Sequence, residues 1–411
     1  MPKNKVIYQS EALFVGPSPA KTEHFLLGSA TGVVSDTLSV AQEYDGRLSL
    51  LTEGNFASLL TNSIEQLHRI QSISYDFGIN RTDVNQFGEL AAIDRIILDS
   101  PTVNLSFSYL LANMANEKNL GLVTDGQETV VRDLINKTAD EKNYFIRTST
   151  EGVDAIGDET EAGEVIGIGN GYLTSYSSTA SVGDLPSVSI SVEGLNMIFD
   201  NDVSGNLLPA INTDDGSVPT GYTYHIPVAT SNQDGVITGD LAISVLRPGD
   251  ITVSIKKRVN TTEDVAVGDY DIGGVDIDGA CIQSYNISFD LGRTPIQCLG
   301  KRNAIDRSLD FPIPVAVSVD ALVGDLTTGN LSDIIDCDNS YDVIVDLKEP
   351  ACGSSTQDIV SRYIVKDTKI DSQSYSSSIG DNKTVTLSMT SQVAGNNQGN
   401  KGIYFSGVAG A

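Results

Sequence analysis

The chain repeats part of its own sequence, 212 residues apart (282 minus 70). When residues 70–95 are laid over residues 282–307 without a gap, 11 of the 26 aligned positions are identical, whereas about two would be expected from average composition. The identical positions, in the numbering of the first segment, are Ile70, Gln71, Ser72, Phe77, Arg81, Thr82, Gly88, Ala92, Ile93, Asp94 and Arg95. This match predicts two copies of one structural unit, and 411 residues are enough for two units that each bury a core.

Apolar and polar residues alternate in both copies, which is typical of strands with one buried face. The alternation covers residues 72–79 and 103–109 in the first copy, and residues 284–291 and 315–321 in the second. Each copy is therefore expected to contain two strands joined by a long connection. These connections are residues 80–100 and 292–312.

The copies also end alike. Tyr176-Ser177-Ser178 resembles Tyr375-Ser376-Ser377, and each precedes a Gly-Asp turn and an alternating segment, 188–192 or 385–389. A less similar stretch with strand-like alternation precedes each copy, and in the second it includes a turn at Pro248-Gly249. We therefore divide the chain into residues 1–197, the first β module, and residues 198–411, the second.

Helical patterns are few. Residues 128–137 place apolar side chains at helical spacing, and residues 330–335 begin with an N-cap pattern. Both follow the second strand of a copy, so one short helix per module is expected in a mainly β protein.

The formal net charge of −28 limits the possible partners. A surface this acidic repels phosphate backbones and anionic lipid, which argues against nucleic-acid binding by charge neutralisation and against docking on membranes. The N-terminal residues do not resemble a signal peptide, and no apolar run approaches the ~20 residues of a membrane helix. The four cysteines are widely spaced without a CxxC pair, so reduced thiols in a cytosolic-type setting are expected.

Patterns of catalytic or binding residues are absent or incomplete. The three histidines are far apart, and Gly167–Gly171 lacks the third glycine and the βαβ context of a dinucleotide-binding loop. Two acidic clusters, Asp200–Gly205 and Asp269–Asp278, are weak candidates for calcium, and turn chemistry explains them as well. We assign no catalytic, cofactor-binding or metal-binding residues, and we expect no cofactor and no enzyme activity.

One segment resembles a known family. Arg69–Ser72, Asn80–Gly88 and Ile93–Arg95 are similar to the signature segment of tail tube proteins (major tail proteins) from tailed bacteriophages, and Pro101–Val103 and Glu11–Ser18 continue the likeness. The similarity covers most of the first module and weakens in the second, where Pro295, Gln297 and Cys298 stand in place of Asp83, Asn85 and Gln86.

The resemblance implies two tandem β-sandwich or β-barrel tube modules, each with one short flanking helix and long loops. It also implies a virion protein, made in the host cytoplasm, whose rings stack into a tube with an acidic lumen that conducts DNA without binding it specifically. Its partners would be further copies of itself and other tail proteins at the tube ends. Two modules per chain then predict a homotrimer with pseudo-sixfold symmetry.

In such a tube the two long connections would be arms that contact a neighbouring subunit or ring. The arm residues we select are Arg81, Asp83, Asn85, Gln86, Phe87, Arg293, Gln297 and Leu299. An ordinary hairpin loop within one module is the alternative, although loops this long in compact domains are usually functional.

Two other classes of protein remain open on the sequence. One is another ring-forming virion component, such as a tail terminator, a distal tail or baseplate protein, or a head decoration protein. The other is an extracellular adhesin module that binds calcium through its acidic loops.

Overall fold

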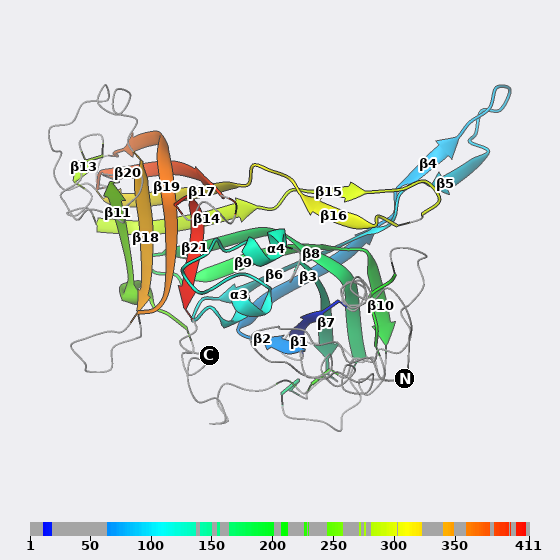
Figure 1. Cartoon of the computed structure of the whole chain (residues 1–411), viewed down its shortest axis with the longest axis horizontal. Helices are drawn as coiled ribbons and strands as arrows, with labels where there is room; N and C mark the ends of the chain where they lie inside the picture. The colour runs from blue at the N-terminus through cyan, green and yellow to red at the C-terminus, as the bar shows by residue number, and fades with distance from the viewer. Residues whose placement is uncertain are drawn as a thin grey trace, which may run out of the picture.

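The computed structural model describes most of the predicted strands of both modules. The described residues are 11–18, 64–136, 140–149, 154–156, 164–200, 207–212, 226–227, 229, 245–257, 271–272, 275–276, 281–301, 303–322, 340–348, 359–378, 382–393, 395 and 400–407. A single sheet of 15 strands runs through this part of the chain, and the mainly β prediction is confirmed (Figure 1).

The strands from the first half of the chain pair in the order β3-β6-β9-β8-β7-β1-β2, with β10 also beside β8. Their bounds are β1 (Glu11–Pro17), β2 (Glu65–Leu67), β3 (Ile70–Gly78), β6 (Thr102–Leu110), β7 (Glu141–Thr148), β8 (Glu164–Ser181), β9 (Ser187–Gly194) and β10 (Asn196–Asp200). β3, β6 and β9 coincide with alternating segments of the sequence, since period-two patterning places every second side chain on the buried face.

The strands from the second half pair in the order β14-β17-β20-β19-β18-β11, with β21 also beside β19. Their bounds are β11 (Ile251–Lys257), β14 (Cys281–Asp290), β17 (Pro314–Leu322), β18 (Tyr341–Lys348), β19 (Ile359–Ser376), β20 (Thr384–Gln392) and β21 (Gly402–Gly407). Strand for strand, this is the order β3-β6-β9-β8-β7-β1 of the first half. A separate small hairpin joins β12 (Asp271–Ile272) to β13 (Val275–Asp276).

β8 and β19 match in detail. Each is 18 residues long, and each contains one non-glycine residue in the left-handed region, Asn170 with φ 51° and Asp367 with φ 58°. These positions are 197 apart, and so are the register shifts after Leu173 and Ile370. Tyr176 therefore corresponds to Gln373, and the sequence alignment of Tyr176 with Tyr375 is wrong by two residues. The alignment was placed by matching tyrosine and serine residues, and such matches do not indicate the position of a β-bulge.

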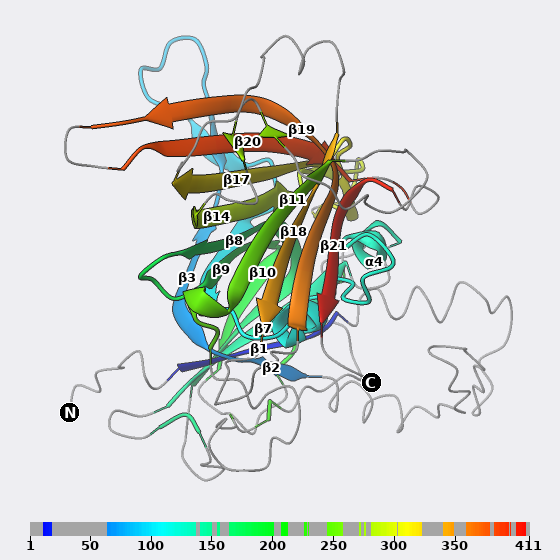
Figure 2. The same ribbon diagram turned by 90° about the vertical axis from the view of Figure 1, so that its left-hand side faces the viewer.

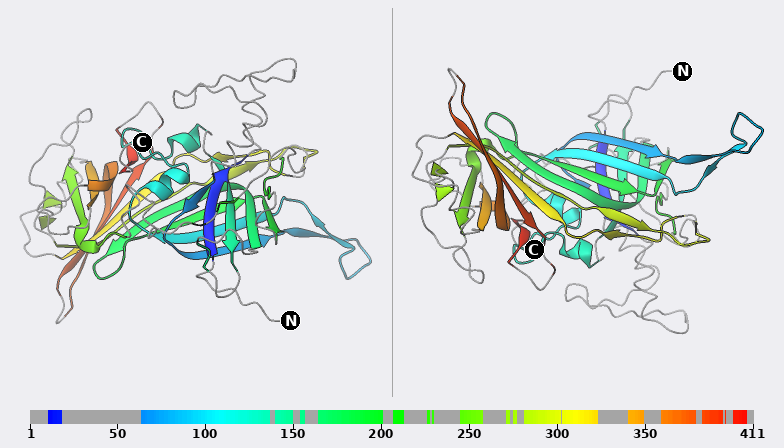
Figure 3. Two further views of the ribbon diagram at one scale, coloured as in Figure 1. Left: turned by 90° about the horizontal axis from the view of Figure 1, so that it is seen from below. Right: turned by 90° about the horizontal axis from the view of Figure 1, so that it is seen from above.

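The two halves join where the C-terminal part of β8 pairs with β14, from Ser181 opposite Ser284 to Ser175 opposite Asp290. This part of β8 thus lies between β9 and β14. Seen from above and below, the strands form a long curved layer that carries this junction near its middle (Figure 3). The proposed module boundary at 197/198 falls inside β10.

A second layer covers one end of this sheet. β11, β18 and β21 cross the direction of β20, β17 and β14 (Figure 2), and a core common to both halves lies among them. Tyr176 of β8 stacks on Phe289 of β14 with ring centroids 5.1 Å apart, and Phe405 of β21 lies 5.3 Å from the same tyrosine ring. Burial of side chains of this size contributes about 2–3 kcal/mol each, so the junction is part of the core.

Helix is short, and its position differs in part from the prediction. α4 (Arg132–Ile135) lies within the predicted 128–137 but is only one turn long, and α3 (Ala115–Asn119) was not predicted. The turn predicted at Pro248-Gly249 forms the 3-10 helix η3 (Pro248–Asp250). The helix predicted at 330–335 lies outside the described residues. Within the described residues the first half thus has two short helices where the sequence predicted one, and Glu117 of α3 is buried.

Candidate assembly surfaces

Both long connections form projecting hairpins. β4 (Arg81–Val84) pairs with β5 (Asp94–Ile97), and β15 (Arg293–Ile296) pairs with β16 (Asp306–Leu309). We call them hairpin 1 and hairpin 2. Hairpin 1 extends away from the sheet, whereas hairpin 2 runs along strands of the first half (Figure 1). The sequence analysis did not predict that these connections would contain strands.

The two hairpins have the same backbone construction. Gly88 and Gly300 both have positive φ, 97° and 88°, a conformation that glycine adopts without strain. The amide of Ile93 donates to the carbonyl of Val84 at 2.8 Å, and its counterpart Ile305 donates to Ile296 at 2.9 Å. The conserved spacing of these contacts explains why Gly and Ile are identical in the two copies.

The aspartates of the Asp-Arg sequences at the start of β5 and β16 contact the backbone. Asp94 Oδ1 accepts the amide hydrogen of Arg95 at 2.7 Å, and Asp306 does the same for Arg307. Arg95 Nε instead pairs across the hairpin with Asp83 Oδ1 at 2.6 Å.

Hairpin 2 is anchored on the first half through its arginines. Arg293 Nη2 lies 2.6 Å from Asp140 Oδ1, with 1% and 2% of the two side chains exposed. Arg293 Nε donates to the carbonyl of Leu173 at 2.9 Å, and its guanidinium lies 5.0 Å from the centre of the Tyr172 ring. Arg307 forms an ion pair with Glu193. Hairpin 2 is thus seated on the neighbouring module of its own chain.

Hairpin 1 carries exposed apolar side chains. Phe87 and Leu90 at its tip are fully exposed, and Val84, Ile93, Ile96, Ile97 and Leu98 are exposed along it. Isolated apolar residues are common on protein surfaces, whereas several exposed apolar residues on one projecting hairpin make it a candidate contact surface.

The residues selected from sequence divide between these hairpins. Arg81 and Asp83 lie on β4, and Asn85, Gln86 and Phe87 lie in the turn that follows, where Gln86 Nε2 donates to Glu89 at 2.8 Å. In hairpin 2, Arg293 lies on β15, and Gln297 and the exposed Leu299 lie in its turn. All except Arg293 are exposed. The selection places five on one hairpin and three on the other.

The two unpaired strand edges form a second pair of surfaces, and their positions were not predicted from the sequence. Within the described residues, β3 pairs with β6 alone, and the C-terminal part of β19 pairs with β20 alone. These edges are the two ends of one run of eight strands, from β19 through β20, β17, β14, β8, β9 and β6 to β3. No sequence signal marks them, because strand pairing between the halves decides which edges remain open.

The glycine-rich segment 167–171 has a packing role. It lies within β8, and a Cβ on Gly169 would be 2.2 Å from the carbonyl oxygen of Pro209, while one on Gly171 would be 2.8 Å from the Tyr144 ring. Side chains larger than hydrogen do not fit between these neighbours.

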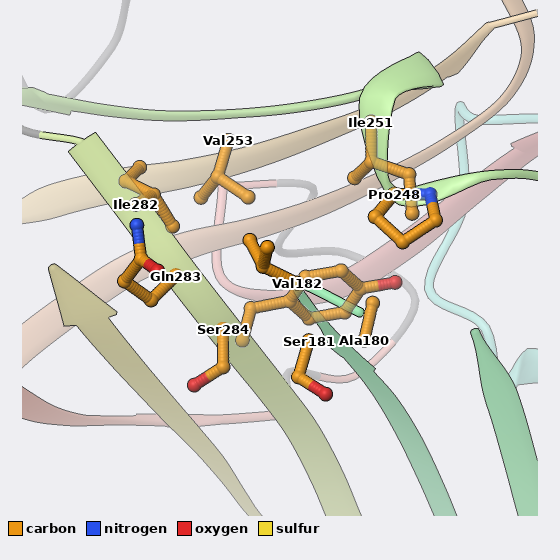
Figure 4. A pocket seen from close by; sticks show the side chains of 10 residues that line it. Ala180, Ser181, Val182, Pro248, Ile251, Val253, Ile282, Gln283 and Ser284 are labelled. Carbon is orange, nitrogen blue, oxygen red and sulfur yellow. The ribbon is translucent and has the colours of Figure 1, made fainter. Parts of the chain in front are cut away.

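A small hollow lies at one end of the β8–β14 junction. Figure 4 shows it between the end of β8, the start of β14 and β11, lined by Ala180, Ser181, Val182, Pro248, Ile251, Val253, Ile282, Gln283, Ser284 and Tyr285. Its lining contains no charged side chain.

Metal-binding and membrane-spanning features were sought in the same part of the chain. Over the described residues, no group of three His, Cys, Asp or Glu side chains is placed to hold a metal ion. Of the acidic clusters considered for calcium, residues 201–206 and most of 269–278 lie outside them. No helix there is long and apolar enough to cross a membrane. Cys281 and Cys298 are free and exposed.

No protein-family model matches the chain, and no curated protein matches it. Among solved structures, it is similar to the tail of an empty gene transfer agent particle with C6 symmetry (15% identity, TM-score 0.24, 40% of this chain and 98% of that one). It is also similar to the sixfold-symmetrised baseplate of an anti-feeding prophage (10% identity, TM-score 0.25, 39% and 93%). A third is the virion of a native gene transfer agent particle (13% identity, TM-score 0.21, 39% and 99%). Because the TM-scores are this low, we base no conclusion about the fold or role of the present chain on these matches.

Proposed function

We propose that this protein is a structural component of a phage virion that forms rings, and that the rings stack into a tail tube. The observation that carries the proposal is a difference between equivalent parts of the two halves. Equivalent hairpins differ in their contacts, and equivalent strands differ in whether they are paired on both sides. One hairpin is seated on the neighbouring half of the chain, and its counterpart projects with its apolar side chains exposed.

Open strand edges support assembly as well. Unpaired N–H and C=O groups along an edge promote edge-to-edge association, which monomeric proteins usually block with charges, prolines or covering loops. Here the edges of β3 and β19 stand at opposite ends of the eight-strand run, so each copy offers a different edge to each neighbour. Contacts of this head-to-tail kind close into rings or grow into filaments.

The duplication specifies the symmetry that we propose. The strand orders of residues 1–197 and 198–411 correspond, so each chain supplies two similar units to a ring. Three chains then give six units and pseudo-sixfold symmetry, with the inter-chain junctions similar to the β8–β14 junction but not identical. Other tail proteins would contact the two ends of the stacked rings.

The net charge of −28 suits a lumen that passes DNA without holding it, because like charges repel the phosphate backbone. No group of catalytic residues enters the proposal, and the protein acts through its shape and its contacts. It resides in the virion after synthesis in the host cytoplasm.

Negative-stain microscopy of the purified protein tests the proposal. We expect hollow tubes, or short stacks of rings, whose number increases with protein concentration. Isolated rings that never stack would favour a terminator, baseplate or decoration protein, and a monodisperse monomer at all concentrations would contradict ring formation. Loss of folding in a chelator would instead favour the calcium-binding adhesin.

A further inference from the structure

Equivalent strands of the two halves have different numbers of neighbours. β14 lies between β17 and β8, whereas its counterpart β3 has β6 on one side and, within the described chain, no strand on the other. The apolar side chains reflect this difference. Phe289 of β14 is 1% exposed, while Phe77, at the same position of β3, is 59% exposed.

The C-terminal part of β19 lacks a neighbour on the side where the equivalent part of β8 pairs with β14. The C-terminal part of β8 lies between β9 and β14, whereas the corresponding part of β19, residues 369–376, pairs with β20 only. Residues 374–376 are exposed, whereas of their counterparts in β8 Ser178 is buried and Ser177 and Thr179 are half-buried. The chain thus contains one complete junction, β8 with β14. The strands equivalent to these two, β19 and β3, each have an open edge.

We infer that β3 of one copy pairs antiparallel with the C-terminal part of β19 of a second copy, and so repeats between chains the β8–β14 junction that exists within each chain. The occupant of each open edge is a second copy of this chain. The inference rests on the proposed self-assembly, since it names the surface through which the ring closes.

Within one described chain these two edges do not pair with each other. Six strands separate the two edges, β20, β17, β14, β8, β9 and β6, and neighbouring strands lie about 4.8 Å apart, which places the edges roughly 34 Å from each other along the sheet.

The internal junction predicts the register between chains. β14 residues map to β3 by subtracting 212, and β8 residues map to β19 by adding 197. The pair Ser288–Ser177 then becomes Asp76–Ser374, and the pair Asn286–Thr179 becomes Ser74–Ser376. By the same rule Phe77 lies opposite Gln373 of the second copy.

Hydrogen bonds in the internal junction show which pairs are close. The amide of Leu291 donates to Thr174 O at 2.7 Å, and that of Val182 donates to Gln283 O at 2.9 Å. Odd-numbered residues of β14 therefore bond to β8, and the pairs between them, including Ser288–Ser177, are the non-hydrogen-bonded ones. In such pairs the Cα atoms are about 4.5 Å apart, within the ~4.4–6.8 Å that a disulfide spans.

Disulfide cross-linking tests the register. In full-length protein with the four native cysteines replaced by serine, we would introduce Ser74→Cys with Ser376→Cys, assemble the protein and oxidise it. Under denaturing, non-reducing conditions we expect covalent dimers, and then covalent trimers once all three junctions of a ring are cross-linked. Ser288→Cys with Ser177→Cys is the matched internal control, which should form an intrachain bond with no increase in mass.

A register control uses the same residue types. Ser74→Cys with Ser372→Cys displaces the partner by four residues along β19, and we expect at least tenfold less cross-linking from it. Equal cross-linking of both pairs, or assembled particles in which only the internal control forms its bond, would overturn the interface while leaving the tube proposal standing. Dimers of Ser74→Cys alone would also overturn it, since they would indicate symmetric β3–β3 pairing.

Failure of the proposed function gives a different result. Cross-linked trimers that never stack into tubes would support the interface and contradict the tail tube. A protein that stays monomeric and forms no interchain bond contradicts both.

Discussion

Arg293 and Arg81 occupy the same position in the two copies but have different surroundings. Arg293 is buried against Asp140, and Arg81 is exposed at the base of hairpin 1. A sequence comparison treats the two as equivalent, since they are aligned and each is followed by a threonine.

Alanine substitution should separate these arginines. Arg293→Ala removes the cationic partner from the buried Asp140 carboxylate, and breaking such a buried pair costs about 3–5 kcal/mol. Arg81→Ala, the matched control, should change the free energy of unfolding of the unassembled protein by less than about 0.5 kcal/mol. Denaturant unfolding of both variants measures the difference, and equal destabilisation would contradict the anchoring of hairpin 2.

Glu117 is a buried carboxyl in the core common to both halves. Its Oε1 accepts hydrogen bonds from Tyr109 at 2.8 Å and Tyr176 at 3.2 Å, and Tyr176 is 2.9 Å from the hydroxyl of Tyr363 in the second half. Desolvation by burial raises the pKa of Glu117 to about 7, against the lowering effects of these hydrogen bonds and of Arg69. The neutral form is therefore favoured in the folded protein.

A raised carboxyl pKa makes the folded state less stable as pH increases. Below the unfolded value of 4.5 the side chain is neutral in both states, and its penalty develops between pH 4.5 and about 7, where the unfolded chain releases the proton first. Glu117→Gln cannot ionise, so the stability of the variant relative to the wild type should increase from pH 4.5 to 8 by roughly 3 kcal/mol. Unfolding measured at both pH values checks this, and a pH-independent difference would show that Glu117 does not titrate in this range.

At the scale of elements, hairpin 1 is separable from the core. Its strands β4 and β5 form a two-stranded sheet of their own, outside the sheet of 15 strands. A surface loop can be shortened at small entropic cost.

Deletion of residues 83–90 should therefore leave the fold intact and abolish tube growth. Circular dichroism and thermal unfolding would report the fold, and negative-stain microscopy would report growth. Normal tubes from the deletion variant would show that hairpin 1 is an ordinary loop, without a role in assembly.

The open edge of β19 provides another test at this scale. The N–H of Tyr176 faces β14 in the internal junction, and by correspondence we expect the N–H of Gln373 to face away from β20 and that of Ser374 to face β20. Proline lacks an N–H and is tolerated at an edge only where none is needed. Gln373→Pro should keep the unassembled protein folded and reduce assembly, while Ser374→Pro should destabilise the fold itself by about 3 kcal/mol. If Gln373→Pro assembles normally, the β19 edge is not used.

Sequence patterns predicted the strands well and their pairing poorly. Alternation located the ends of β3, β6, β14 and β17 within three residues, because it depends on local burial of one face. The hairpin strands β4 and β15 escaped notice because they are exposed on both faces and show no alternation. The open edges depend on contacts between residues more than 100 positions apart, such as Tyr176 and Phe289, which no local pattern contains.

At the scale of the whole molecule, the chain consists of two halves with similar strand order, joined at the β8–β14 junction. The open edges of β3 and β19 are equivalent to the two strands of that junction. The two ends of the eight-strand run do not pair within one described chain, and by the inferred interface three copies would make a barrel in which no edge of this run is left unpaired. Closure of this kind removes the aggregation hazard that the edges create in a monomer.

The number of chains per ring tests this account most directly. Mass measurement of single rings by native mass spectrometry, combined with averaged end-on views, gives both the number of chains and the number of lobes. We expect three chains and six lobes. Six chains per ring, or a ring whose lobes equal its chains in number, would contradict the account.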